Sequence, residues 1–177
     1  MTTENTAPTG KEFVISRTFD APRELVWKAC TEPERLALWW GPTGFKMHAC
    51  TLDLRPGGSF HYGMQPPAGS PMGNAVLWGK FVYREIVKPE CIVFVNSFSD
   101  AHGGLTRHPL HPGWPLEVLN HQTFTEHQGK TTITLRGYPI NATEAERNAF
   151  ESAFKSMEQG FGGTFNQLAA YLAKANS

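Results

Sequence analysis

Two amide side chains, Asn120 and Gln122, stand at alternate positions of a segment that has the composition of a strand. Phe124 follows at the same spacing, and since successive side chains of a strand point to opposite faces, all three share one face. If this face is the core side, both amides are buried, and a buried amide without partners costs about 1–3 kcal/mol. The pattern therefore predicts either a cavity that positions a small ligand, or a bulge or different register that leaves both amides in solvent.

Aromatic and methionine side chains are predicted to face the same space from neighbouring strands and from a C-terminal helix. The residues that we expect to line a ligand cavity are Trp39, Phe60, Tyr62, Met64, Trp78, Phe81, Asn120, Gln122, Met157 and Phe161. Such a lining suits a small, largely apolar molecule, and an aromatic one would suit it well.

The adjacent pair Trp39 and Trp40 raises a question of packing. On a helix over 33–40, Leu36 and Trp40 are four residues apart and share a face, whereas Trp39 is turned by about 100°. By direction, Trp40 is the better core anchor of the two. We expect both rings to cover the end of the sheet as ordinary core. The alternative is that Trp39 lies at the cavity mouth or at a subunit contact.

The sequence gives weaker support for a metal site or for acid–base catalysis. His108 and His111 have a short spacing, but no cysteine or glutamate accompanies them in their proline-rich loop, so we predict solvated histidines and no metal site. The acid–base candidates include His61, Glu117 and His121, which strand alternation assigns to the outer face of the sheet. No nucleophile elbow, phosphate-binding loop, dinucleotide fingerprint or zinc-protease motif occurs in the sequence.

Charge and cysteine content narrow the protein class. Sixteen basic residues balance sixteen acidic ones, which argues against binding to nucleic acid or to an anionic membrane. The cysteines at positions 30, 50 and 91 lie far apart in apolar settings, as expected of reduced core residues. Without a signal-peptide pattern or a long apolar run, we expect a cytoplasmic protein that is not inserted into a membrane.

Periodicity gives the order of the elements that position these residues. We predict a flexible tail over 1–11 and a single domain over 12–175, in which a strand precedes two short helices, about six strands and one long amphipathic helix. The strands are predicted at 13–19, 47–54, 58–64, 76–87, 92–98, 116–126 and 131–138, and the short helices at 22–31 and 33–40. The Pro- and Gly-rich segment 99–115 is long enough for a functional loop or lid.

Glycines at 160, 162 and 163 interrupt the long helix, where each costs roughly 1 kcal/mol relative to alanine. They permit close packing against the sheet, which we favour, or leave room for a ligand. Thr143 followed by Glu146 has the pattern of a capping box at the start of this helix.

Several segments carry a family resemblance: FDAPRELVWKACTEPERLALWWGP, LRPGGSFHYGM, GKFVYREIVKPECIVF, WPLEV and EQGFGGTFNQLAAYL. Together they resemble the helix-grip superfamily of START and Bet v 1-like domains, and within it the branch related to the C-terminal domain of the Hsp90 ATPase activator. The resemblance implies an α+β fold in which a curved antiparallel sheet of about seven strands wraps around the long helix, with a cavity between them. It says little about a reaction, because one fold hosts many functions.

The leading functional hypothesis is therefore binding of a small apolar or aromatic molecule between the sheet and the C-terminal helix, with no cofactor. One alternative, supported by the resemblance alone, is a protein-binding module that contacts Hsp90 as the activator does. Another is an enzyme of the cyclase or dehydratase kind, which requires an acid–base pair inside the cavity. A homodimer formed through an exposed strand or the Trp39 region is compatible with each hypothesis.

Overall fold

The computed structural model describes residues 10–176 and contains one curved antiparallel sheet. Its strands follow the order β1-β8-β7-β5-β4-β3-β2, and the short β6 pairs with β5. Prolines and glycines at the tight turns and long alternating segments between them favour this hairpin-rich arrangement. The strands are β1 (Phe13–Phe19), β2 (Lys46–Leu52), β3 (Ser59–Gln65), β4 (Leu77–Val87), β5 (Cys91–Ser99), β6 (Leu105–Thr106), β7 (Glu117–His127) and β8 (Lys130–Ile140).

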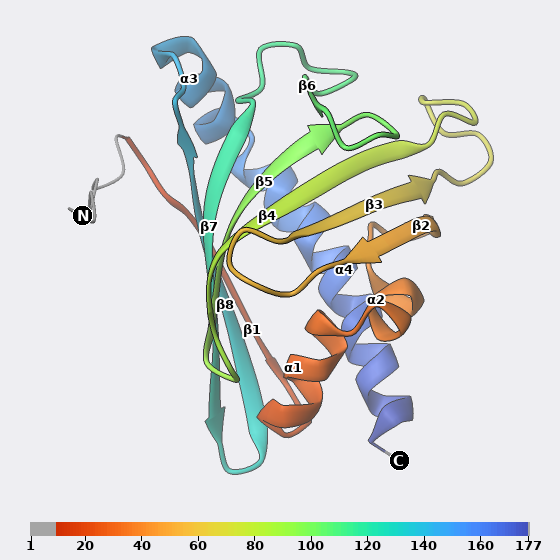
Figure 1. The fold of residues 1–177 in the computed structure, drawn as a ribbon, viewed down its shortest axis with the longest axis vertical. Helices are drawn as coiled ribbons and strands as arrows, with labels where there is room; N and C mark the ends of the chain where they lie inside the picture. Colours follow the sequence, from red (N-terminus) through yellow and green to blue (C-terminus); the bar gives the residue numbers. More distant parts are fainter. Residues whose placement is uncertain (1–9, 177) are drawn as a thin grey trace.

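Four helices complete the fold, and the longest lies along the concave side of the sheet (Figure 1). They are α1 (Arg23–Thr31), α2 (Pro33–Trp39), α3 (Glu144–Ser152) and α4 (Phe154–Ala175). The short helices α1 and α2 lie near the C-terminal end of α4, whereas α3 lies near its start, beside the β6 loop (Figure 1). This arrangement confirms the helix-grip fold that the sequence resembles.

The main core fills the space between the sheet and the helices. Phe124, Ile133 and Leu168 are at most 1% exposed and belong to one cluster that draws on strands and on α1, α2 and α4. A second, smaller cluster forms on the other face around Val93, Val95, Leu119 and Tyr138. Burial on both sides of β5 explains why this strand has a nearly continuous apolar sequence.

The prediction of one long C-terminal helix is wrong in one respect: the helix breaks at Ala153. This residue has φ −96° and ψ 3°, and it ends α3 and begins α4. Phe150 on α3 is fully buried and packs against Trp114 and Phe154, so α3 adds a buried side chain to the core independently of α4. A single non-helical residue hardly changes the spacing of apolar positions, and periodicity therefore does not reveal the break.

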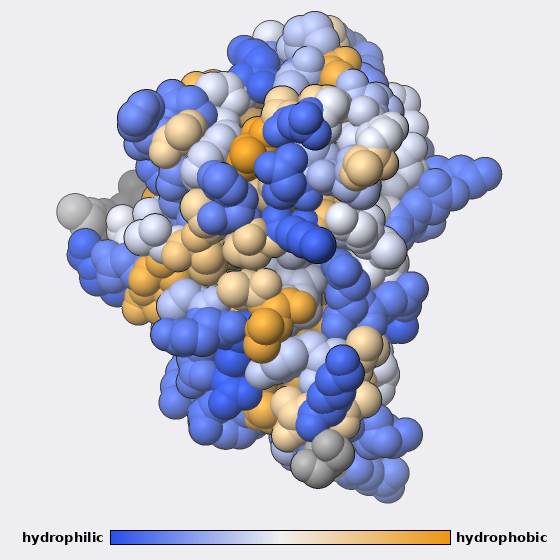
Figure 2. All heavy atoms as spheres, turned by 90° about the vertical axis from the view of Figure 1, so that its right-hand side faces the viewer, coloured by the Kyte–Doolittle hydropathy of each residue, from blue (hydrophilic) through white to orange (hydrophobic). Residues whose placement is uncertain are grey.

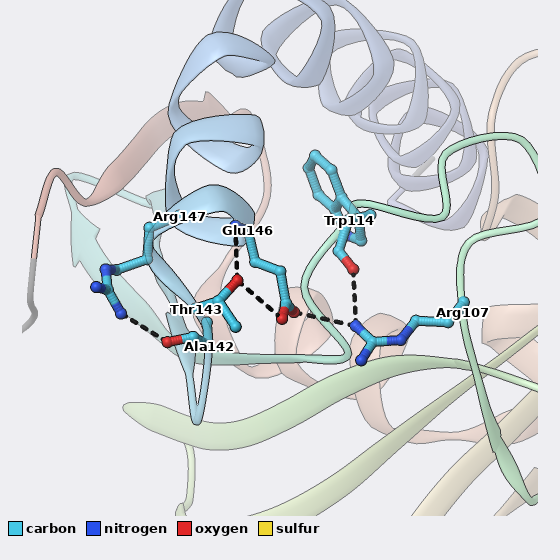
Figure 3. A network of polar contacts seen from close by, with 6 residues as sticks. All are labelled: Arg107, Trp114, Ala142, Thr143, Glu146 and Arg147. Carbon is cyan, nitrogen blue, oxygen red and sulfur yellow. Dashed lines mark hydrogen bonds and ion pairs between the residues drawn. The ribbon is translucent and has the colours of Figure 1, made fainter.

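The segment 99–115 contains β6, which sequence analysis missed, and it is attached to α3. Arg107 Nη1 lies 3.0 Å from Glu146 Oε2 and donates a hydrogen bond to the Trp114 carbonyl oxygen (Figure 3). Thr143 caps α3 as predicted, because its hydroxyl accepts a hydrogen bond from the Glu146 backbone N–H at 3.1 Å (Figure 3). Polar contacts thus join the loop to the start of α3, at the end of the sheet where α4 begins.

Cys30, Cys50 and Cys91 are free thiols, and burial raises the pKa of Cys30 to about 12. In the described part of the chain, no helix is long and apolar enough to cross a membrane. The predicted tail over 1–11 falls mainly on residues 1–9, which lie outside the described residues.

Candidate functional site

A cavity of about 280 Å³ lies between the concave face of the sheet and α4. This volume is just below the range of about 300–1,000 Å³ that is typical of small-molecule sites. Strands β3, β4, β5, β7 and β8 form one side, α4 forms the other, and the chain after α2 closes part of the rim. The lining residues are Trp39, Trp40, Gly41, Pro42, Tyr62, Met64, Leu77, Phe81, Phe94, Asn96, Phe98, Asn120, Gln122, Ile133, Leu135, Met157, Gly160, Phe161, Thr164 and Phe165.

The structure brings most of the predicted site residues together in this lining. They are Trp39, Tyr62, Met64, Phe81, Asn120, Gln122, Met157 and Phe161. Phe60 does not reach the cavity but packs beside it, with its ring centre 4.7 Å from that of Tyr62. Whether these residues hold a ligand stays a prediction.

The prediction for Trp78 is wrong. Trp78 lies on the outer face of the sheet, where its ring stacks on His61 with the ring centres 5.2 Å apart. The reason is strand alternation: Leu77 and Phe81 point into the cavity, so Trp78 points away from it.

Both adjacent tryptophans pack in the main core, as expected, but Trp39 and not Trp40 is the more deeply buried of the two. Trp39 is 5% exposed, and its indole N–H donates a hydrogen bond to the Ala29 carbonyl oxygen at 2.9 Å. Trp40 is less buried, and its indole N–H has no hydrogen-bond partner among the described residues. Helix α2 ends at Trp39, and Trp40 has an extended backbone with ψ 135°, so the helical angle between the two side chains does not apply.

The amide side chains form a strip of uncharged polar groups, the polar strip, on the sheet side of the cavity. Asn120 and Gln122 point inward, as alternation from Phe124 predicts, and β7 runs through this region without a bulge. Asn96 joins them from β5, where Phe94 pairs with Asn120 and Asn96 pairs with Val118. Asn96 and Asn120 are therefore diagonal neighbours, roughly 7–8 Å apart.

Sequence analysis did not identify Asn96, although the same alternation could have found it. Ile92 and Phe94 are buried on the inner face of β5, and counting by two from them reaches Asn96. Its position directly after the apolar run Ile92 to Val95 is the signal.

The hydrogen-bonding capacity of the strip is largely unfilled. The Asn120 amide donates to the Val118 carbonyl oxygen at 3.1 Å, yet its Oδ1 accepts no hydrogen bond from a described residue. The Gln122 amide reaches only Cys30 Sγ, at 4.0 Å. Asn96 makes no side-chain hydrogen bond within residues 10–176. Polar groups in such a state attract a ligand or water.

Tyr62 adds a hydroxyl to the same cavity, and a glycine gives it room. The Tyr62 ring lies across Gly79, its partner on β4, so that a Cβ atom at Gly79 would meet the hydroxyl oxygen at 2.4 Å. Burial raises the pKa of Tyr62, and the nearby Trp40 N–H opposes the rise without reaching hydrogen-bonding geometry. Tyr62 is therefore a neutral phenol that can donate a hydrogen bond.

A glycine on β8 gives the Asn120 side chain room in the same way. Gly137 is its cross-strand partner, and a Cβ atom there would lie 2.6 Å from Asn120 Oδ1. Two glycines thus make room for two of the polar side chains that line the cavity.

On the helical side, the expectation that the glycines pack closely against the sheet is wrong: of the three glycines only Gly163 has a close neighbour, which is Thr43 in the chain after α2. A Cβ atom at Gly163 would approach Thr43 Oγ1 at 3.0 Å, whereas Gly160 and Gly162 have open space beside them. Gly160 lines the cavity and Gly162 does not. The glycine at 160 therefore leaves room at the cavity wall.

A larger, more open groove of about 700 Å³ adjoins the cavity under the 99–115 loop. Phe98 and Met157 line both spaces. His108 is packed in this groove, with its ring centre 4.4 Å from that of Phe98 and 4.7 Å from that of His111. Burial, and secondarily the nearby His111, lowers the pKa of His108, so the picture of fully solvated loop histidines is wrong for this residue.

The cavity contains little that could perform acid–base catalysis. Among residues 10–176, no lysine, arginine, histidine, aspartate or glutamate lines it. His61 lies on the outer face with Trp78, and its Nε2 is 3.1 Å from the Asp100 carbonyl oxygen. No cluster of described residues could hold a metal ion.

Solved structures of bacterial proteins share this fold. A protein of Nitrosomonas europaea matches with a TM-score of 0.70 at 22% identity, covering 93% of this chain and 96% of its own. A protein of Mycobacterium smegmatis matches with a TM-score of 0.70 at 26% identity, covering 91% and 90%. The AHSA1 protein of Silicibacter pomeroyi matches with a TM-score of 0.67 at 18% identity, covering 93% and 99%.

No curated protein matches the chain. The family model described as activator of Hsp90 ATPase homolog 1-like protein matches residues 20–173, which include every element from α1 to most of α4. Fold and family together support a module that binds a ligand or a protein. The chain belongs to the activator of Hsp90 ATPase homolog 1-like family.

Proposed function

We propose that this protein binds a small, largely apolar molecule in the cavity between the sheet and α4. The observation that carries the proposal is an aromatic and aliphatic cavity with a strip of amides whose hydrogen-bonding capacity is unfilled. A cavity kept only for packing would be expected to be lined by apolar groups alone, because polar groups there need water or a ligand as a partner. The absence of charged side chains from the described lining favours an uncharged interior over a catalytic one.

Gly160 offers a direct test of cavity binding. Gly160 is an exposed residue at the edge of the cavity with open space beside its Cβ position, so Gly160→Leu is expected to place a side chain across the cavity opening. The neutral dye N-phenyl-1-naphthylamine should fluoresce strongly with the natural protein, and the variant should weaken its binding at least tenfold, which is about 1.4 kcal/mol. Fluorescence titration at neutral pH measures this effect.

Gly162→Leu is the matched control. It makes the same change on the same helix, also into open space, but away from the cavity lining. Both variants should gain helical stability, since a glycine inside a helix is unfavourable. Equal dye binding by the natural protein and Gly160→Leu, or no dye binding by the natural protein, would contradict the proposal. Native mass spectrometry of both proteins would show in parallel whether a small molecule co-purifies.

The family description also favours a second candidate function, contact with an Hsp90-type chaperone. On the face shown in Figure 2, apolar side chains gather in groups bordered by polar and charged residues. An ATPase assay with Hsp90 separates the two functions: stimulation that persists in Gly160→Leu would assign chaperone contact to a surface outside the cavity.

A further inference from the structure

We infer that the ligand is a neutral ring compound with a hydroxyl or carbonyl group, and that Asn120, within the strip of uncharged polar side chains, recognises this group. The inference rests on the proposed function, because it concerns the occupant of the same cavity. It goes further by naming the charge of the ligand, its polar group and the side chain that selects it.

The requirement for a neutral ligand follows from the lining. Within the described residues, the cavity offers amides, a phenol and apolar groups but no ionised side chain. Amides can donate and accept hydrogen bonds, yet they do not neutralise a charge. An ionised carboxylate or ammonium group would lose its hydration without gaining a counter-ion, at a high energetic cost. A fatty-acid anion or a phosphate ester is therefore a poor occupant.

The requirement for a polar group follows from burial. Asn120 is 7% exposed, and its Oδ1 accepts no hydrogen bond in the described structure. The side chain of Asn96 is unpaired as well, and the Tyr62 hydroxyl has no partner that meets hydrogen-bonding geometry. A pure hydrocarbon would displace water from these groups without forming hydrogen bonds to them, and its affinity would therefore be lower. A hydroxyl or carbonyl group replaces the lost water.

The register spreads these groups along the cavity: Asn120 Oδ1 lies beside Gly137 on β8, Asn96 lies on β5, and the Tyr62 hydroxyl lies over Gly79 on β4. A single hydroxyl or carbonyl group therefore meets one of them at a time. The aromatic rings that line the remaining wall, including Trp40, Phe81 and Phe94, suit the flat faces of a ring.

The experiment uses three probes that share one ring system: naphthalene, 2-naphthol and 2-naphthoate. Each probe is titrated at pH 7 against the natural protein saturated with N-phenyl-1-naphthylamine, and displacement gives its affinity. We expect 2-naphthol to bind about tenfold more tightly than naphthalene, as one or two net hydrogen bonds would give. The ionised 2-naphthoate should bind at least tenfold more weakly than 2-naphthol.

Asn120→Leu removes the central amide while keeping a side chain of similar size. It should abolish the preference for 2-naphthol over naphthalene and leave the affinity for naphthalene at least as high. Asn166→Leu, at an exposed position of α4, is the matched control and should preserve the preference. Circular dichroism establishes that both variants are folded.

The outcomes separate this inference from the proposed function. If the dye binds in the cavity, but 2-naphthoate displaces it best or none of the three probes displaces it, the inference is wrong while cavity binding stands. A preference for 2-naphthol that survives in Asn120→Leu would also overturn the inference. If dye binding is insensitive to Gly160→Leu, the proposed function itself fails.

Discussion

Trp39→Ala is expected to lower the free energy of unfolding by about 3–5 kcal/mol, the range for removing a buried tryptophan from a core. Trp39 is 5% exposed and packs in the main core cluster. Its ring meets that of Trp40 edge-on, with the ring centres 5.7 Å apart. The substitution leaves a void beside the cavity that the surrounding strands and helices can fill only in part. Urea denaturation followed by circular dichroism measures the loss.

A pair of phenylalanine variants tests which of the two tryptophans anchors this corner. Trp39→Phe removes the hydrogen bond to the Ala29 carbonyl oxygen, whereas Trp40→Phe removes an indole N–H that has no partner among residues 10–176. We expect Trp39→Phe to cost about 1–2 kcal/mol more than Trp40→Phe, because only the first breaks a buried hydrogen bond. A larger loss for Trp40→Phe would restore Trp40 as the anchor of this corner, and equal losses would show that neither tryptophan dominates it.

The tryptophan pair shows where sequence reasoning stops. The proline that opens α2 and the Gly41-Pro42 pair that follows it predicted a short helix at the right place. The prediction that Trp40 is the better anchor failed because it depended on whether Trp40 is the last helical residue or the first extended one. Helix ends are uncertain by one or two residues, and one residue changes the direction of the side chain by about 100°.

Strand periodicity was more informative than helix periodicity for the cavity. Alternation along β7 assigned Asn120 and Gln122 to the side on which the structure places them, and the same rule assigns Asn96 and excludes Trp78. The consequence of a glycine could not be predicted in this way. Gly160 faces open space and Gly163 faces Thr43, a difference that depends on what lies opposite α4 and not on the local sequence.

Gly79→Ala is expected to disturb both stability and ligand binding, because it removes the space that holds Tyr62. The new Cβ atom would lie 2.4 Å from two atoms of the tyrosine, Cζ and the hydroxyl oxygen. The ring cannot easily move aside, since Phe60 and Phe81 surround it with ring centres at 4.7 and 5.8 Å. Overpacking of this kind costs about 1–3 kcal/mol. Because Tyr62 lines the cavity, displacement of its ring should also weaken binding of both 2-naphthol and naphthalene.

Gly63→Ala, on the opposite face of the same sheet, is the matched control. Gly63 pairs with Trp78 on β4, and a Cβ atom at Gly63 would lie 2.9 Å from the Trp78 ring. Trp78 is half-buried on the outer face, so its ring can move toward solvent when Gly63→Ala is introduced. This variant should lose less than 1 kcal/mol, as expected where the neighbouring group can yield, and it should bind both naphthalene probes like the natural protein. If Gly79→Ala and Gly63→Ala changed stability and probe binding to the same extent, the tight fit of Tyr62 over Gly79 would have no special role. The amides alone would then be the polar groups of the site.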